Sequence, residues 1–145
     1  METEIKYKAF SPDEHLSGVL GICRAIEWDN FHYDPDLTRK SLTAPGVTTI
    51  VAVSPEEAVA GFAQIQGDGV GLQTHLSLLA VDEGWRRKGI ARRLVEEGFR
   101  RLGAARMDPT SSDEALDFYR TFAHREQTGF RLYPNPHTKN NGRPD

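Results

Sequence analysis

The sequence has one cysteine and no long hydrophobic run, and these two absences exclude several classes of protein. Cys23 cannot close an intramolecular disulfide by itself, and no Cys/His spacing resembles a zinc site. No apolar stretch approaches the roughly 18 residues that span a bilayer. The start, METEIKYKAF, has neither a basic segment nor the apolar stretch of an export signal. We therefore expect a cytoplasmic protein with no metal, no disulfide and no membrane segment.

The chain also lacks internal repeats and low-complexity tracts. Its 145 residues are close to the commonest length of one domain, and 38% hydrophobic and 27% charged residues are typical of a globular protein. The last dozen residues, PNPHTKNNGRPD, contain no apolar side chain to bury. We expect a single domain over residues 1–133 and a flexible tail over residues 134–145.

Charge is distributed unevenly along the chain, although the net charge is only -3. Residues 1–80 hold 5 Lys/Arg against 11 Asp/Glu, whereas residues 81–145 hold 13 against 10. The basic residues cluster between Arg86 and Arg106. This concentration predicts an anionic partner for that segment and suggests a cationic one for the acidic half.

The hydrophobic periodicity predicts an α/β (α+β) fold with the element order β-α-α-β-β-β-α-β-α-β. Residues 27–33, rich in aromatic and acidic side chains, are expected to form a loop between the first two helices. Strands are expected at residues 5–10, 47–53, 58–66, 70–81, 104–108 and 127–133, and helices at residues 12–26, 35–44, 86–102 and 115–123.

Helix starts are marked by capping residues. Ser11 with Glu14, and Ser111 with Glu114, each have the spacing of a capping box, in which the two side chains bond to each other's backbone N–H. Asp34 stands directly before a proline and predicts the N-cap of the second helix.

The most informative segment joins the strand that ends at Val81 to the following helix through the run Arg86-Arg87-Lys88-Gly89-Ile90-Ala91. The first turn of a helix has N–H groups without intrahelical partners, and small residues allow an anion to approach them closely. A pyrophosphate would suit such a cradle. Neither G-x-x-x-x-G-K-[ST] nor G-x-G-x-x-G occurs, so the sequence does not support a P-loop NTPase or a dinucleotide-binding fold.

This run resembles motif A of the GNAT superfamily of acetyl-CoA-dependent N-acetyltransferases, whose signature is Gln/Arg-x-x-Gly-x-Gly/Ala. Trp85 directly before the run, Leu94 after it, and the element order over residues 3–133 agree with the resemblance. It implies a central mixed, mostly antiparallel sheet flanked by about four helices. It also implies acetyl transfer from acetyl-CoA to an amine in a ternary complex, without a metal.

The resemblance further assigns residues to the coenzyme A site. The backbone amides of residues 87–91 would bind the pyrophosphate, and residues 79–81 would pair with the pantetheine arm, where an N–H near Val81 could hold the oxyanion. The implied cofactor-binding residues are Leu79, Ala80, Val81, Arg86, Arg87, Lys88, Gly89, Ile90 and Ala91. The alternative is that the arginines form only a solvated basic face.

Two residues are candidates for moving protons. The acceptor amine must lose its proton, and His75 is the candidate base. It lies six residues before Val81, and the period of two predicts that it shares a strand face with Leu79 and Val81. Its position resembles the one that holds glutamate in histone acetyltransferases and histidine in serotonin acetyltransferase. Tyr119 resembles the motif B tyrosine that protonates the leaving thiolate. Each residue could instead serve packing.

The acceptor is not fixed by the resemblance. In this family the first two helices and their loop usually cover the acceptor site, and here Trp28 and Tyr33 are the substrate candidates. Aromatic and acidic residues together suit a small cationic amine. The alternatives are a protein lysine or N-terminus as acceptor, and a non-catalytic acyl-CoA sensor. We expect no nucleic-acid or membrane partner; a homodimer is possible because dimers are common in the family.

Overall fold

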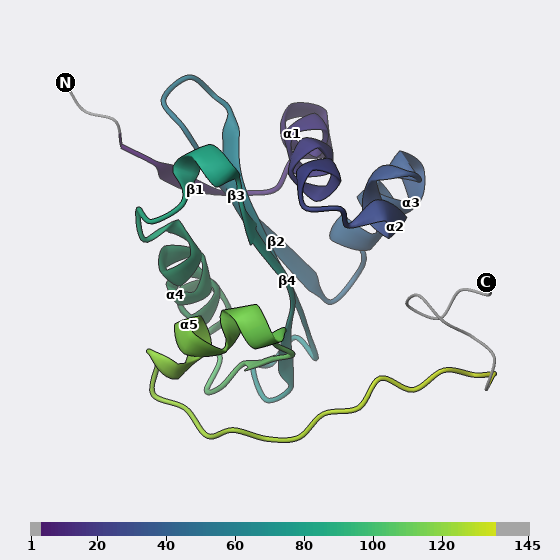
Figure 1. Ribbon diagram of the computed structural model, residues 1–145, viewed down its shortest axis with the longest axis vertical. Coiled ribbons are helices and arrows are strands. Elements are labelled where there is room, and N and C mark those ends of the chain that lie inside the picture. Colours follow the sequence, from purple (N-terminus) through teal and green to yellow (C-terminus); the bar gives the residue numbers. More distant parts are fainter. Residues whose placement is uncertain (1–3, 136–145) are drawn as a thin grey trace. The chain divides into compact units, whose positions relative to one another are not determined.

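The computed structural model describes residues 4–135 as five strands and five α-helices with two short 3-10 helices (Figure 1). The chain divides into two units, one ending at Pro109 and one starting at Thr110, and each is described by itself. The elements are β1 (Lys6–Ala9), α1 (Pro12–Ala25), α2 (Asp29–His32), α3 (Pro35–Leu42), β2 (Val47–Val53), β3 (Val59–Gly67), β4 (Thr74–Val81), η1 (Glu83–Trp85), α4 (Ile90–Leu102), β5 (Asp108–Pro109), η2 (Asp113–Ala115) and α5 (Leu116–Arg120).

The sheet has the strand order β1-β2-β3-β4-β5. The first three pairings are antiparallel, and the last, between β4 and β5, is parallel and only two residues long. The expected mixed, mostly antiparallel sheet with flanking helices is thus confirmed. Because β5 is so short, most of the outer edge of β4 has no paired strand among residues 4–135.

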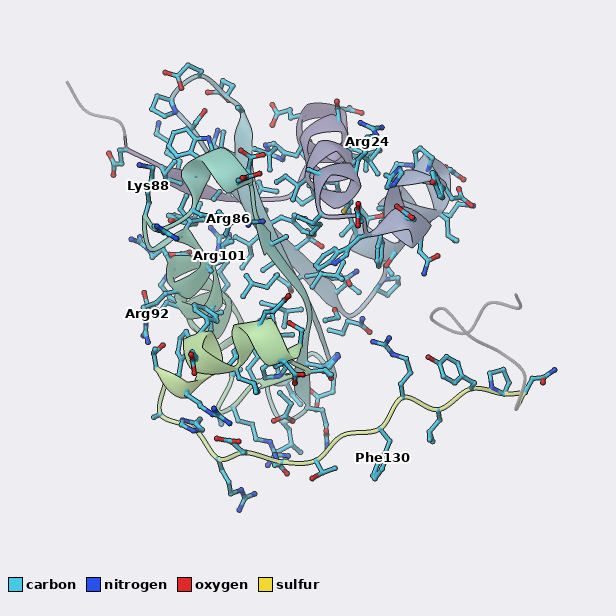
Figure 2. The ribbon with its side chains drawn as sticks, viewed as in Figure 1. Arg24, Arg86, Lys88, Arg92, Arg101 and Phe130 are labelled. Carbon is cyan, nitrogen blue, oxygen red and sulfur yellow. The ribbon has the colours of Figure 1, made fainter. Side chains whose placement is uncertain are left out.

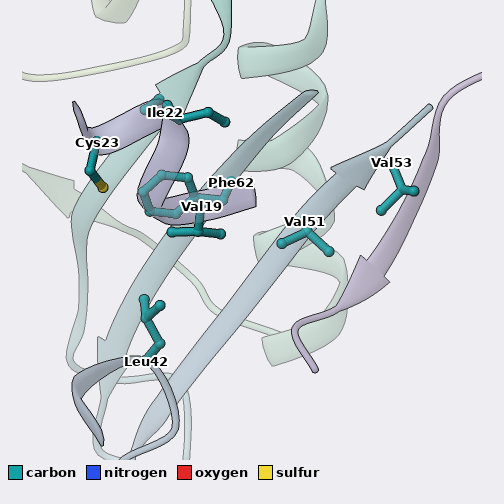
Figure 3. Packing of buried hydrophobic residues seen from close by; sticks show 8 residues of the cluster. Val19, Ile22, Cys23, Leu42, Val51, Val53 and Phe62 are labelled. Atoms are coloured by element: carbon teal, nitrogen blue, oxygen red, sulfur yellow. The ribbon is translucent and has the colours of Figure 1, made fainter. Parts of the chain in front are cut away.

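The main hydrophobic core lies between the sheet and helices α1 and α3 (Figure 3). Phe62 in the middle of β3 is fully buried and packs with residues of β2 and of both helices. Burial of a side chain of this size contributes roughly 1.5–3 kcal/mol. The cluster consists of Val19, Ile22, Cys23, Leu42, Val51, Val53, Phe62 and Ala80.

Helix α4 covers the opposite face of the sheet (Figure 1). It can approach β3 closely because Gly98 has no side chain: a Cβ there would lie 2.5 Å from Cδ1 of Ile65. Ile90, Leu94 and Val95 on the same side of the helix are buried. The expected helix is therefore present, although it starts at Ile90 rather than Arg86 and leaves the basic run in a loop.

The caps of two helices differ from the expected capping boxes. At the start of α1, Ser11 makes no side-chain cap, and its N–H instead donates to Nδ1 of His15 at 2.9 Å. His15 is buried, and this burial lowers its pKa and favours the neutral ring that can accept the bond. Ser111 also caps nothing, because the following helix starts after Ser112. Asp34 caps α3 as expected, accepting from the N–H of Leu37 at 3.1 Å.

Two further expectations about where helices and strands begin are wrong. The segment expected as a loop at residues 27–33 contains the one-turn helix α2. The third strand of the meander begins at Thr74 rather than Val70, because the Asp68 carboxylate accepts from the N–H groups of Val70 and Gln73 and closes the intervening turn.

The unit that begins at Thr110 contains η2 and α5, so the α-helix expected at residues 115–123 is reduced to Leu116–Arg120 and follows a 3-10 turn. The strand expected at residues 127–133 is absent from this described part of the chain. Phe130 and Leu132 are 86% and 87% exposed there, and Figure 2 shows the Phe130 ring projecting from an extended segment. Residues 136–145 of the expected tail lie outside the described residues.

A cluster of charges joins the outer side of α4 to β1. The side chain of Glu97 is 8% exposed and lies 2.7 Å from Nη2 of Arg100, 3.1 Å from Nε of Arg101 and 3.6 Å from Nε of Arg93. Arg101 also donates to the carbonyl oxygen of Tyr7, and Arg93 lies over the Tyr7 ring. The bonds from Arg100, followed by those from Arg101, lower the pKa of Glu97 to about 2.

This depressed pKa predicts how stability depends on pH. Unfolding returns the carboxyl to its ordinary pKa near 4.5, so its stabilising effect is complete above that pH and is lost as the pH falls toward 2. We expect Glu97→Gln to lower the free energy of unfolding at neutral pH and to reduce the fall between pH 4.5 and 2, measured by urea unfolding. Glu96→Gln, whose carboxylate is exposed and 3.7 Å from Arg92, is the control and should change little. Parallel pH curves for wild type and Glu97→Gln would contradict the assignment.

Candidate active site

The turn that follows β4 is held by its own side chains. Asp82 caps η1 by accepting from the N–H of Gly84 at 3.2 Å. Nε of Arg86 donates to the main-chain oxygen of Val81 at 3.2 Å and so ties the end of the turn back to the strand. The basic loop therefore starts from a fixed point at the end of β4.

The loop itself has the backbone shape of an anion site. Arg87 has a φ of 66° and Gly89 a φ of 80°, so two left-handed residues precede the first helical residue, Ile90. Left-handed residues alternating with others turn successive N–H groups into one concavity. The first helical bond runs from the N–H of Arg93 to the oxygen of Gly89, so the N–H groups of Ile90 and Ala91 have no acceptor within the helix.

Charge reinforces this geometry. A helix N-terminus carries about half a positive charge, and Arg86 and Lys88 extend from the loop that leads into it (Figure 2). A non-glycine residue at positive φ costs roughly 1–2 kcal/mol, and such strain is concentrated at functional sites. Glu27 and Glu57 also have positive φ, so the strain at Arg87 supports a site here only together with the helix N-terminus and the basic side chains. The residues present fit a pyrophosphate.

The outer edge of β4 continues from this loop. The N–H of Asp82 donates to the oxygen of Ala60, and in an antiparallel pair the bonded residues alternate. The main-chain groups of Ala80 therefore face β3, whereas those of Leu79 and Val81 face the open edge. An extended arm of a ligand can pair with these groups as an added strand would.

A β-bulge separates this edge from His75. Gln64 is opposite Leu78 and Ile65 is opposite Leu76, so Ser77 is one residue more than β3 can pair with. His75 is consequently opposite Gln66, while Leu79 is opposite Ala63. Cross-strand partners share a face of the sheet, and Gln66 and Ala63 point to opposite faces because they are three residues apart on a regular strand. The expectation that His75 shares a face with Leu79 and Val81 is therefore wrong.

His75 instead faces the side of α1 and α3. Gln64 lies on that face, where its Nε2 donates to the oxygen atoms of Ser41 at the end of α3, and His75 is on the same face by register. The ring is exposed, and its Nδ1 lies 2.6 Å from the main-chain oxygen of Asp108 in β5. A pocket of about 380 Å³ opens beside it, between the β3–β4 hairpin and Asp108.

The two substrate candidates have different surroundings in the structure. Trp28 is half-buried and packs against Phe31 and edge-on against Phe62, which makes it part of the core on the α1 face. Tyr33 is 74% exposed and its ring lies 4.3 Å from that of His32. Several nearby acids have structural partners: Asp29 is 2.9 Å from His32, Asp34 caps α3 and Asp36 pairs with Arg39 and Lys40.

Tyr119 belongs to α5 in the unit that starts at Thr110, and its ring contacts that of Phe118. Burial raises the pKa of its phenol, so the group keeps its proton near neutral pH. Cys23 is buried in the core, and burial raises the pKa of its thiol to about 11, which makes it unreactive as a nucleophile.

The polar groups inside the sheet were not predicted from the sequence. Gln64 is 3% exposed, and its carbonyl oxygens accept from the hydroxyl of Ser77. The sequence did contain a sign of these groups: Gln64 stands in the apolar run of β3, and a buried glutamine must find hydrogen-bond partners. No sequence signal pointed to the main-chain oxygen of Asp108, since any residue carries one.

These features agree with a comparison of the chain with protein families. The model of the acetyltransferase (GNAT) domain matches residues 10–142. The chain belongs to the GNAT acetyltransferase family. The match runs through both units of this GNAT protein and includes the loop, β4 and α5.

Solved structures of three acetyltransferases have a similar fold. A GNAT family acetyltransferase from Streptococcus pneumoniae TIGR4 has a TM-score of 0.67 at 22% identity, over 93% of this chain and 99% of that one. The aminoglycoside N-acetyltransferase AAC(6')-Iy, solved with CoA, has a TM-score of 0.67 at 18% identity, over 90% of this chain and 95% of that one. An aminoglycoside acetyltransferase from an uncultured soil metagenomic sample, solved with sisomicin, has a TM-score of 0.69 at 22% identity, over 90% of this chain and 96% of that one. Identities this low show a shared fold.

None of the curated proteins compared with this GNAT protein matches it significantly. Within residues 4–135, no three His, Cys, Asp or Glu side chains gather as a metal site would require. No helix in that part of the chain is long and apolar enough to cross a membrane.

The loop geometry predicts the effect of a substitution at Gly89. A glutamate there would be strained at a φ of 80° and would place a negative charge in the proposed pyrophosphate cradle. We expect Gly89→Glu to weaken coenzyme A binding at least about 100-fold, roughly 2.7 kcal/mol, measured by calorimetry.

Gly103 provides a matched control. It is also left-handed, with a φ of 60°, has no atom near its missing Cβ, and lies at the opposite end of α4. Gly103→Glu introduces the same charge and a similar strain away from the cradle, so it should leave binding unchanged. Equal losses in the two variants would show that the effect is one of stability and would remove the loop from the site.

Proposed function

We propose that this GNAT protein is an N-acetyltransferase that moves acetyl from acetyl-CoA directly to the primary amine of a small cationic molecule. The observation that carries the proposal is the continuity of the left-handed loop at Arg87 and Gly89 with the open main-chain edge of β4. A ligand with a diphosphate and an extended amide-containing arm fits both features together. The CoA in the structure of AAC(6')-Iy supports this choice of ligand.

In the proposed complex, the N–H groups of residues 87–91 bind the pyrophosphate, and Leu79 to Val81 pair with the arm. The arm runs from the loop toward the bulge, so its thioester end lies near Leu79. The N–H of Leu79 faces the open edge and can donate to the thioester oxygen as negative charge develops there. This differs from the expected donor near Val81, because Val81 lies closer to the loop that binds the pyrophosphate than the thioester end of the arm does.

The amine approaches from the face of α1 and α3, where His75 lies. Its nitrogen attacks the thioester carbon, the carbon–sulfur bond breaks, and the amine proton must leave. Four residues of extended chain separate Leu79 from His75, which is roughly 13 Å at about 3.3 Å per residue. A base must be within about 3 Å of the proton or act through a water molecule. Because roughly 13 Å of strand is more than one water molecule can bridge, we propose that His75 takes the proton through a chain of water molecules.

The leaving thiolate takes a proton from Tyr119 in this proposal. The raised pKa of the phenol keeps a proton available, and the assignment rests on the resemblance of the α5 sequence to motif B. We also propose that residues 1–133 act as one catalytic domain, since the family match spans both units. Free Cys23 is compatible with a cytoplasmic, reducing location.

The pocket beside His75 supports a cationic acceptor. Asp68 and Asp108 are among its lining residues, and no lysine or arginine of the described residues lines it. Bonds from the N–H groups of Val70 and Gln73 lower the pKa of Asp68, so its charge is present near neutral pH. Two of the similar structures are aminoglycoside acetyltransferases, one of them with sisomicin bound. Trp28 and Tyr33 remain the proposed substrate contacts on the same side of the sheet.

Turnover with a set of amines tests this function. We expect release of the coenzyme A thiol from acetyl-CoA with sisomicin or spermidine, at a rate well above that with glycine, whose carboxylate should be repelled by Asp68 and Asp108. Mass spectrometry should detect one added acetyl group on the amine. Tight CoA binding without turnover of any amine would indicate a sensor, and acetylation of a lysine peptide alone would indicate a protein acceptor.

Variants of the two proton-transfer residues give different signatures. His75→Ala should lower kcat by roughly 100-fold or more and change the shape of the pH–rate profile. Tyr119→Phe should lower kcat by a similar factor and leave the acid side of the pH–rate profile as it is in the wild type. Neither should change the affinity for CoA. A profile that His75→Ala leaves unaltered would exclude His75 as the base.

A further inference from the structure

The hydrogen bond between His75 and β5 has a chemical consequence beyond its geometry. Nδ1 of His75 lies 2.6 Å from the main-chain oxygen of Asp108, and a carbonyl oxygen can only accept a hydrogen bond. The proton of this bond must therefore be on Nδ1. In the neutral ring, one nitrogen carries a proton and the other an unshared electron pair, so Nε2 must be the nitrogen that can accept.

We infer that the main-chain carbonyl of Asp108, held in place by Pro109, positions His75 as the Nδ1–H tautomer, so that Nε2 is its proton-accepting atom. This inference rests on the proposed function for its role in catalysis. The carbonyl is a positioning group, because it acts on the imidazole and does not itself touch the amine. The tautomer itself can be observed whether or not the protein is active.

The sequence of β5 explains how the carbonyl is held. A residue that precedes proline is restricted to extended backbone conformations, because the proline ring clashes with the helical ones. Asp108 is such a residue, and the parallel pairing places it opposite His75 with Pro109 opposite Leu76. Proline has no N–H, so it cannot add a second donor next to this bond. A strand of two residues is thereby enough to fix the direction of one carbonyl.

The surroundings leave Nε2 available. Within residues 4–135, Nε2 of His75 makes no hydrogen bond or ion pair, and His75 and Asp108 both line the pocket of about 380 Å³ described above. The other titratable group on the pocket is Asp68, whose two oxygens accept from backbone N–H groups of its own turn. No described carboxylate is thus bonded to His75, and the carbonyl alone determines its tautomer.

Nitrogen-15 NMR of the uniformly labelled full chain tests the inference directly. At a pH where the imidazole is neutral, we expect the His75 signals of a protonated Nδ1 and an unprotonated Nε2. A protonated Nε2, or an averaged mixture of tautomers, would overturn the inference. This measurement needs neither a substrate nor a variant, so it decides the question even if a variant fails to fold.

Two variants separate the carbonyl from the carboxylate of Asp108. Pro109→Ala releases the restriction on Asp108, so tautomer mixing should appear, and kcat with spermidine should fall about tenfold or more while the Kd for CoA stays the same. Asp108→Ala keeps both the carbonyl and the following proline, so the tautomer should be unchanged, whereas the KM for spermidine should rise. A tautomer change in Asp108→Ala, or an unmixed tautomer in Pro109→Ala, would overturn the role of the held carbonyl. Absence of turnover in the wild type would overturn the proposed function and leave the NMR result standing.

Discussion

Ser77 is one residue more than β3 can pair with, and the consequences of this extra residue extend along the whole of β4. Before the bulge, His75 faces α1 and α3 and pairs with β5. After it, the main-chain groups of Leu79 and Val81 lie on an edge with no paired strand in the described part of the chain. A regular strand would have placed the His75 ring on the α4 face, away from the predicted acceptor side. In the proposed reaction, the bulge therefore lets one strand serve two ligands, with its edge toward the acyl donor and the His75 side chain toward the amine.

The bulge is itself stabilised from inside the sheet. Bulged residues lose ladder hydrogen bonds, and a buried polar group without a partner costs about 1–3 kcal/mol. Here the Ser77 hydroxyl donates to both oxygens of Gln64, and Gln64 donates to Ser41, so no described side-chain polar atom in the interior is left without a partner. A polar chain thus connects the end of α3 with the irregular point of β4.

The sequence predicted the features that arise from local chemistry. The basic loop, its glycine and the helix after it follow from residue types at fixed spacing, and the structure has the left-handed Gly89 and the helix start where such a motif needs them. The Asp34 cap follows from one residue and its neighbour. The face of His75 could not be predicted, because a bulge depends on pairing with a distant strand and the period-two rule holds only for regular strands. The capping box at Ser11 failed for a related reason: the buried ring of His15 competes for the same N–H, and that burial is a tertiary effect.

The polar segment that ends in Pro109 shows how a departure from regular strand chemistry can be useful. Proline ends the pairing of β5 after two residues, which leaves the rest of the β4 edge open for an extended ligand. The same proline restricts Asp108, whose carbonyl meets the ring of His75. A longer apolar strand at this position would pair with Leu79 and Val81 and compete with the acyl donor for their N–H groups. Shortening the strand therefore provides both the free edge and the fixed carbonyl. The two requirements of the proposed reaction, an oxyanion donor and an oriented base, are met by the main chain on either side of Ser77.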